Sequence, residues 1–202
     1  IFMKLETKNF YKTVGALVLP IALQNLINVA VTSADVVMLG RVGETVLSGS
    51  SLAGQVQFVL TLFLFGLTSG AAVLTAQYWG KKDMRTIEKV MGIAFRFSII
   101  VSVIFLLAVQ IFPAQVMSIF TPEQPVIDEG VKYLRIVSFT YLLCAVTQVY
   151  LNVMRSVERV VIATVTYSVS LIVNIVINGI LIFGLLGFPR LGIVGAAIGT
   201  LI

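Results

Sequence analysis

Residues 14–39, VGALVLPIALQNLINVAVTSADVVML, decide the fold class of this chain. The stretch is long enough to cross a hydrocarbon core of about 30 Å, which takes about 20 apolar residues in a helix. Asp35 is its single acidic residue. A carboxylate at membrane depth costs at least about 2.5–3.5 kcal/mol, so we interpret Asp35 as a functional residue. The alternative is a position at a helix end, within reach of headgroups and water.

The composition extends this interpretation to the whole chain. Of its 202 residues, 58% are hydrophobic and 11% are charged, whereas soluble domains average about 45–50% and about 25%. Because lipid cannot satisfy open backbone groups, the membrane spans are expected to be helices. The predicted class is therefore an all-α integral membrane protein. The net charge of +5 lies mostly in short loops, which favours a role in orientation over nucleic-acid binding.

Further apolar stretches predict the order of the helices. We expect them at residues 14–39, 52–79, 90–112, 131–154 and 160–185, with an incomplete sixth at 191–202. The Gly- and Ser-rich sequence GRVGETVLSGSS predicts a loop between the first two. Another loop is expected after Pro113, because Glu123, Asp128 and Glu129 cannot enter hydrocarbon. The last stretch reaches only about 18 Å, so we expect a truncated sixth helix.

Positive charges predict the orientation of these helices. One side of the membrane receives nine Lys and Arg residues: Lys4, Lys8, Lys12, Lys81, Lys82, Arg85, Lys89, Arg155 and Arg159. The other side receives Arg41, Lys132, Arg135 and Arg190. Cytoplasmic loops carry the excess of positive charge. We therefore expect a multi-pass protein of the cell (inner or plasma) membrane with a cytoplasmic N-terminus.

Polar residues recur on one face of two predicted helices. At about 100° per residue, Gln24 and Asn28 align with Asp35 on the first helix. The same arithmetic aligns four residues on the fifth: Tyr167, Ser170, Asn174 and Asn178. A single amide is interpreted as interhelical hydrogen-bond glue, whereas two stripes can converge on one carboxylate. We predict a water-filled substrate cavity lined by Gln24, Asn28, Tyr167 and Ser170, with Asn174 and Asn178 beside Asp35.

No enzyme site is found in the sequence. The chain has no His and one Cys, Cys144, which excludes a disulfide and a Cys/His zinc site within it. P-loop and GxSxG patterns are missing, and no second intramembrane acid is placed to form a catalytic pair with Asp35. We expect no enzymatic activity and no cofactor, apart from H⁺ or Na⁺ as a transported ion.

Three motifs, in this order, resemble one family of transporters. SADVVMLGRVGETVLSG, at residues 33–49, is similar to the end of the first helix and the first loop of the MATE (multidrug and toxic compound extrusion) family. AQYWGKKD, at 76–83, resembles the end of the second helix. The run RSVERVVIATVTYSVSLIVNIVINGILIFGLLGFPRLGIVGAAIGT, at 155–200, resembles the fifth helix and the opening of the sixth. The similarity spans the chain and indicates the N-terminal lobe of a DinF-like member.

This resemblance implies a twelve-helix fold of two six-helix lobes, of which the chain is the N-terminal one. It also implies that small, cationic, lipophilic substrates are exported by antiport with H⁺ or Na⁺. The implied partners are the lipid bilayer, these substrates and the C-terminal lobe of the same protein.

The resemblance also assigns roles to residues. Asp35 falls on the carboxylate proposed for cation coupling in DinF-like members, and Asn174 on the asparagine near it. Asn178 departs from the pattern, because many relatives carry Asp there. One carboxylate with amides is a weaker site for a hard cation than two carboxylates, which favours H⁺ over Na⁺.

Two other functions stay open at this point. A lipid-linked oligosaccharide flippase of the same superfamily shares the implied fold, but such proteins usually present intramembrane Arg or Lys to a pyrophosphate. Apart from Arg96, this chain offers no intramembrane Arg or Lys, since Lys132 and Arg135 are assigned to the outer end of the fourth predicted span. A non-transporting membrane scaffold or receptor would leave the polar stripes unexplained.

Overall fold

A computed structural model describes residues 2–158, 160–187 and 189–202, with all of their side chains except those of residues 2–10, 12–13, 16–17, 24, 160, 162–163, 167 and 186. Every regular element in these residues is a helix, as the composition predicts. They are α1 (Phe2–Gly40), α2 (Glu44–Gly80), α3 (Met84–Ile111), α4 (Pro113–Ser118), α5 (Gln124–Val137), α6 (Thr140–Ser156), α7 (Val160–Phe183), the 3₁₀ turn η1 (Leu185–Gly187) and α8 (Ile193–Leu201).

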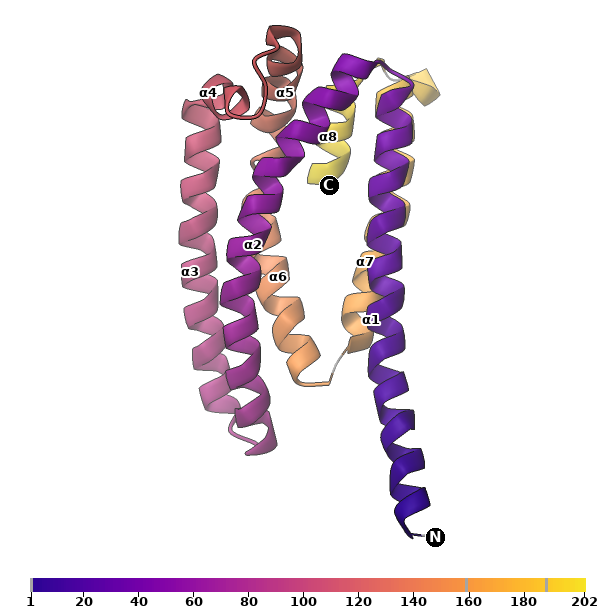
Figure 1. Ribbon diagram of the computed structural model, residues 1–202, viewed down its shortest axis with the longest axis vertical. Helices are drawn as coiled ribbons and strands as arrows, with labels where there is room; N and C mark the ends of the chain where they lie inside the picture. The colour runs from indigo at the N-terminus through magenta and orange to yellow at the C-terminus, as the bar shows by residue number, and fades with distance from the viewer. Residues whose placement is uncertain (1, 159, 188) are drawn as a thin grey trace.

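The helices form two groups that come together at one end of the molecule (Figure 1). In one group α2 packs against α3, α5 and α6, and in the other α1 packs along α7. The short helix α8 contacts both α7 and α5 and so joins the groups. The N-terminus and the α2–α3 and α6–α7 connections lie at the opposite end (Figure 1).

Among the described residues, four helical segments are long and apolar enough to cross a membrane, or five if α5 and α6 count as one bent span. They are Val18–Gly40 of α1, α2, α3 and Thr164–Phe183 of α7. Their surfaces carry exposed large side chains such as Leu19 (72% exposed) and Phe65 (66%). This exposure suits helices surrounded by hydrocarbon rather than by water.

The buried core lies within the first group of helices. Leu60 and Leu64 of α2 pack with Val109, Leu134 and Tyr141 of α3, α5 and α6. A smaller cluster of Leu39, Ile182 and Ala196 holds α1, α7 and α8 together. The second cluster sets the distance between α1 and α7, on which the candidate site depends.

The first predicted loop is mostly helical, because α2 begins at Glu44 rather than at residue 52. A Cβ at Gly49 would lie 2.9 Å from the backbone nitrogen of Gly130 in α5. The Ser50 hydroxyl donates back to the Leu47 carbonyl at 2.9 Å. The Gly and Ser content therefore marks a close helix crossing, and the prediction of a loop up to residue 51 is wrong.

Helix α3 begins at Met84, earlier than the predicted residue 90, because Asp83 caps it. The Asp83 carboxylate accepts hydrogen bonds from the Thr86 hydroxyl at 2.6 Å and from the Thr86 backbone nitrogen at 3.1 Å. These bonds to Thr86 lower the pKa of Asp83. The Asp-x-x-Thr pattern is a helix start signal that the hydropathy argument overlooked.

The predicted acidic loop after Pro113 is also largely helical. α5 begins at Gln124 with Pro125 in its first turn, where the missing N–H of proline has no helical partner to lose. Asp128 accepts from the Gln124 side chain at 2.9 Å, and Glu129 pairs with Lys132 at 2.5 Å. These carboxylates are accommodated on a helix at the end of the molecule, so the connection between α4 and α5 is limited to residues 119–123.

The helix predicted at residues 131–154 is two helices, since α5 and α6 meet at 53°. The break frees backbone carbonyls that a continuous helix would satisfy. Gln110 of α3 replaces a missing backbone donor at the break. Its Nε2 donates at 2.8 Å to the Arg135 carbonyl and at 2.8 Å to the Ser138 hydroxyl. Of the other predicted bounds, α1 begins at Phe2 instead of residue 14, whereas α7 and α8 lie close to prediction.

Replacing Gln110 by leucine is expected to destabilise the folded protein by about 1–3 kcal/mol, because the Ser138 hydroxyl would lose its donor and the Arg135 carbonyl would keep only the longer bond from Ser138 Oγ at 3.2 Å. Thermal unfolding of the detergent-solubilised protein measures this loss. Gln115→Leu on the exposed surface of α4 is the matched control and should leave the unfolding temperature unchanged. Equal unfolding temperatures for Gln110→Leu and wild type would mean that the break needs no such support.

Candidate functional site

The structure joins Asp35 to two asparagines of α7 through a short chain of hydrogen bonds. Nδ2 of Asn178 donates to Oδ1 of Asp35 at 2.6 Å and to Oδ1 of Asn174 at 3.1 Å. Nδ2 of Asn174 in turn donates to the Gly199 carbonyl of α8 at 3.2 Å. Asn178 is fully buried (0% exposed), whereas Asp35 and Asn174 are half-buried. Three helices therefore meet at one carboxylate.

Helical spacing explains why these residues meet. Asn174 and Asn178 are one turn apart on α7, so they share a face, and α7 packs along α1 for much of its length. Leu39 and Ile182, one turn beyond Asp35 and Asn178, pack in the same cluster and hold the two helices in register. Asn178 of the polar stripe predicted on the fifth helix thus contacts Asp35 directly, and Asn174 is linked to Asp35 through Asn178.

The Asp35 side chain lines a cavity of about 590 Å³ between α1, α2, α5, α7 and α8. Its wall is apolar at Val31, Val36, Leu39, Leu47 and Phe58. Its polar lining comes from Thr32, Asp35, Ser50, Ser51, Gln55, Gln57, Thr61, Tyr133, Asn174 and Thr200. A cavity that combines apolar wall, uncharged polar groups and one carboxylate suits a lipophilic molecule of positive charge.

Tyr133 and Thr200 belong to this site, although the sequence argument did not select them. The Tyr133 hydroxyl lies beside Thr200 and close enough to Asp35 for an electrostatic interaction between the two groups. The Thr200 hydroxyl donates to the Ala196 carbonyl at 2.9 Å. Tyr133 was assigned to a span with no polar stripe, and no periodic signal in α5 points to it.

Of the other predicted cavity residues, the two whose side chains are described are not brought to Asp35. Asn28 and Ser170 are exposed, and neither lines this cavity. The side chains of Gln24 and Tyr167 lie outside the described residues. The assignment of these four residues to a substrate cavity stays a prediction. Gln55 and Gln57 of α2, by contrast, do line it, and Gln57 also contacts Cys144 at 3.9 Å.

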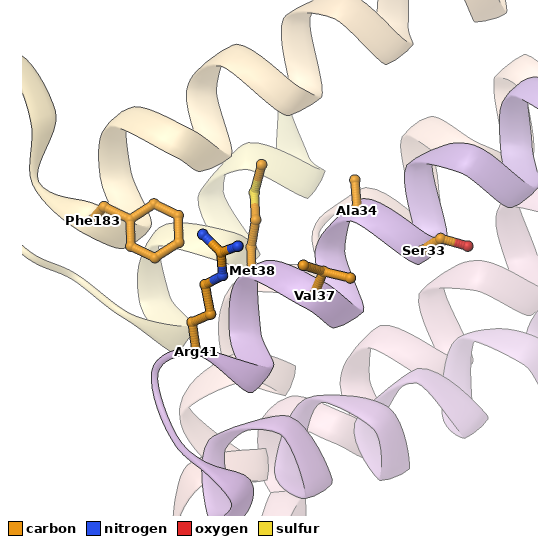
Figure 2. A pocket seen from close by; sticks show the side chains of 6 residues that line it. All are labelled: Ser33, Ala34, Val37, Met38, Arg41 and Phe183. Carbon is orange, nitrogen blue, oxygen red and sulfur yellow. The ribbon is translucent and has the colours of Figure 1, made fainter.

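A second hollow, of about 370 Å³, lies on another face of α1. Figure 2 shows its lining, in which Arg41 at the end of α1 points toward Phe183 of α7, and the remaining residues are Ser33, Ala34, Val37 and Met38. It does not include Asp35 or either asparagine. We therefore take the 590 Å³ cavity as the candidate site.

The chemistry that this site offers is reversible protonation of the Asp35 carboxylate. Burial favours the neutral, protonated form of a carboxyl group, whereas a donated N–H or a nearby cation favours the charged form. Within the described side chains no three His, Cys, Asp or Glu residues come together as a metal site. One group that exchanges a proton for an organic cation fits this geometry.

Comparison with known proteins places the chain among transporters. A family model described as MatE matches residues 20–180. The probable multidrug resistance protein YoeA of Bacillus subtilis is 24% identical over 200 residues, which cover 98% of this chain and 43% of that protein. The probable multidrug resistance protein NorM of Rhizobium meliloti is 28% identical over 177 residues, covering 87% and 38%. The chain therefore spans less than half the length of these relatives.

Solved structures show the same fold. An outward-facing multidrug resistance MATE family transporter of the MOP superfamily superposes with a TM-score of 0.84 at 20% identity, over 94% of this chain and 41% of that one. A MATE structure in a bent conformation gives a TM-score of 0.81 over 94% and 42%. The likeness in fold therefore extends over nearly all of this chain.

Proposed function

Because the chain belongs to the MatE family, as its motifs predicted, we propose that it forms the Asp35-containing lobe of a secondary active multidrug exporter. The substrates are small, lipophilic organic cations, which leave the cell in exchange for inward H⁺. Family members are transporters and not enzymes. The observation that carries the proposal is a half-buried carboxylate that accepts a hydrogen bond from Asn178, at the wall of a cavity lined by both apolar and polar side chains.

The mechanism follows from competition at Asp35. An organic cation in the cavity stabilises the carboxylate, whereas a proton from the outside neutralises it and removes the attraction for the cation. Proton binding and substrate binding then exclude each other. A proton gradient across the membrane then drives the substrate out toward the side from which the protons enter. This exchange in opposite directions is what antiport requires.

The direction of the Asn178 hydrogen bond supports H⁺ rather than Na⁺ as the coupling ion. A hard cation needs several oxygen ligands around it. Asn178 turns its N–H group to Asp35, and that group cannot bind a cation. The carboxylate nevertheless remains free to accept a proton on its other oxygen.

A flippase for lipid-linked oligosaccharides is less well supported by the cavity. The charged residue that lines it is Asp35, a carboxylate, and the other lining residues in the described part are uncharged. An anionic pyrophosphate would be repelled at that wall. We therefore retain the exporter as the proposed function.

The proposal extends to the surroundings of the lobe. We place the protein in the plasma membrane with the N-terminus and the α2–α3 and α6–α7 connections on the cytoplasmic side, because the basic residues concentrate there. The other partners are the bilayer and a second lobe of similar size, consistent with the greater length of the relatives. Membership of the DinF-like branch stays a prediction.

Vesicle transport tests the coupling ion. The full-length protein is reconstituted into proteoliposomes, and accumulation of a fluorescent lipophilic cation is followed under an imposed pH gradient with Na⁺ replaced by choline. We expect accumulation to require the pH gradient and to persist without Na⁺. Strict dependence on a Na⁺ gradient would contradict proton coupling, and absence of transport under every gradient would contradict the exporter itself.

A further inference from the structure

Gly199 of α8 lies unusually close to the Asn178 side chain. A Cβ built on Gly199 would lie 1.7 Å from Oδ1 and 2.8 Å from Cγ of Asn178. Real Cβ atoms are not found at such distances from other side chains, so any residue except glycine must displace this amide. The clash involves a side chain that is fully buried (0% exposed).

The same oxygen of Asn178 has no hydrogen-bond partner among the described residues. Since buried polar atoms are nearly always paired, this one calls for an explanation. It faces the position that a Cβ of Gly199 would occupy, so its contact there is with the glycine's Cα–H. A Cα–H···O contact of this kind is a weak hydrogen bond, and only glycine, which has no Cβ, can approach the oxygen so closely.

The carbonyl of Gly199 fixes the direction of the hydrogen-bond chain. A carbonyl oxygen only accepts, so Asn174 must turn Nδ2 toward it and Oδ1 toward Asn178. Asn178 must then turn Nδ2 toward Asn174, and the second N–H of that group reaches Asp35. Reversing either amide would set two oxygens against each other.

We propose that Gly199 is a positioning residue for Asp35: its missing side chain makes room for the Asn178 amide, and its carbonyl orients the chain so that N–H rather than oxygen meets the carboxylate. The inference deepens the proposed function, because it rests on Asp35 as the proton-binding group. Gly199 does not touch the proton or the substrate cavity and acts through the two asparagines.

The surroundings of Asp35 leave few other groups to set its protonation. From α5 the titratable neighbour is Tyr133, and from α8 the hydroxyl of Thr200 lies nearby. The residues that α2 contributes to the cavity wall are uncharged. From α7 the amides of Asn174 and Asn178 face it. A change in the amide geometry should therefore be visible in the titration of Asp35.

Infrared difference spectroscopy of the full-length protein tests the proposal. The carboxylic-acid band that disappears in Asp35→Asn is assigned to Asp35 and followed against pH. In Gly199→Ala we expect its midpoint to rise by about one pH unit, because the carboxylate loses a hydrogen bond that favours its charged form. An unchanged midpoint would overturn the proposal.

Gly179→Ala provides the matched control. Gly179 is the neighbour of Asn178 on α7, and a Cβ there meets nothing within 4 Å. An added methyl group at this position should leave the Asp35 midpoint and the folded yield unchanged. A shift equal to that of Gly199→Ala would show a general response to added bulk and would also overturn the proposal.

A second substitution separates positioning from simple packing. Asn178→Ala removes the amide that Gly199→Ala would displace, so the double variant should titrate like Asn178→Ala alone. If Gly199→Ala does not fold by itself, the double variant should fold. Failure of both to fold, or a further shift in the double variant, would mean that the methyl group disturbs α8 itself and would contradict a role through Asn178.

The outcomes also distinguish this inference from the proposed function. A shifted midpoint in Gly199→Ala, with transport that survives Asp35→Asn, would retain the positioning role and remove proton coupling through Asp35. An unshifted midpoint, with transport lost in Asp35→Asn, would remove the positioning role of Gly199 and retain proton coupling through Asp35.

Discussion

Replacing Asp35 by asparagine is expected to abolish proton-driven export, lowering it at least about a thousandfold or to the background of empty vesicles. The substitution removes the one carboxylate that lines the cavity and barely changes side-chain volume. An amide cannot exchange a proton at any pH that the cell reaches, so the competition that drives export disappears. Its oxygen can still accept from Asn178 Nδ2, so the α1–α7 contact is expected to persist.

Expression, stability and a control variant show whether the loss of export is due to the missing Asp35 charge. Expression and detergent stability of Asp35→Asn should equal those of wild type, since the hydrogen-bond chain to α7 is kept. Asp128→Asn, on the exposed part of α5, is the charge control and should export normally. Normal export by Asp35→Asn at matched expression would remove Asp35 from the mechanism.

Replacing Asn178 by aspartate is expected to change the coupling ion. The new carboxylate would stand where the amide now lies 2.6 Å from Asp35 and 3.1 Å from Asn174 Oδ1. Two carboxylates so close cannot both be charged without a cation between them. Oxygen atoms then replace the N–H group, and oxygen is the ligand that hard cations require.

Transport by Asn178→Asp should therefore fall by about tenfold or more under a pH gradient alone and recover when Na⁺ is added. Sodium-dependent stabilisation against heat, absent in wild type, is the accompanying measurement. Asn178→Ala, which also loses the amide but adds no carboxylate, should show no recovery with Na⁺. Export by Asn178→Asp that remains proton-driven and indifferent to Na⁺ would show that this position does not select the ion.

Helical periodicity was sufficient to predict the part of the site that lies on two long, regular helices. Asp35 stood out because it is an acid within an apolar span, and Asn174 and Asn178 because they repeat one turn apart. Such spacing defines a face of a helix before any partner is known. Asn28 and Ser170 satisfy the same spacing but are exposed, since periodicity assigns a face and not the depth or the partner of each residue.

The rest of the site depends on contacts between helices, which the sequence does not encode locally. Tyr133 lines the cavity from α5, which meets α6 at 53° in a break that the sequence did not predict. Gly199 looks like an ordinary small residue of a packed helix until Asn178 is placed against it. Gly49 was interpreted as part of a turn for the same reason, because glycine signals both turns and close backbone contacts.

Proton release on substrate binding shows whether a proton is exchanged for a cation at Asp35. The purified full-length protein is mixed with tetraphenylphosphonium in weakly buffered solution, and the change in pH is recorded beside the amount of cation bound. We expect binding to release protons from wild type and none from Asp35→Asn. Binding without proton release in wild type, or equal release from Asp35→Asn, would contradict exchange of a proton for a cation at Asp35.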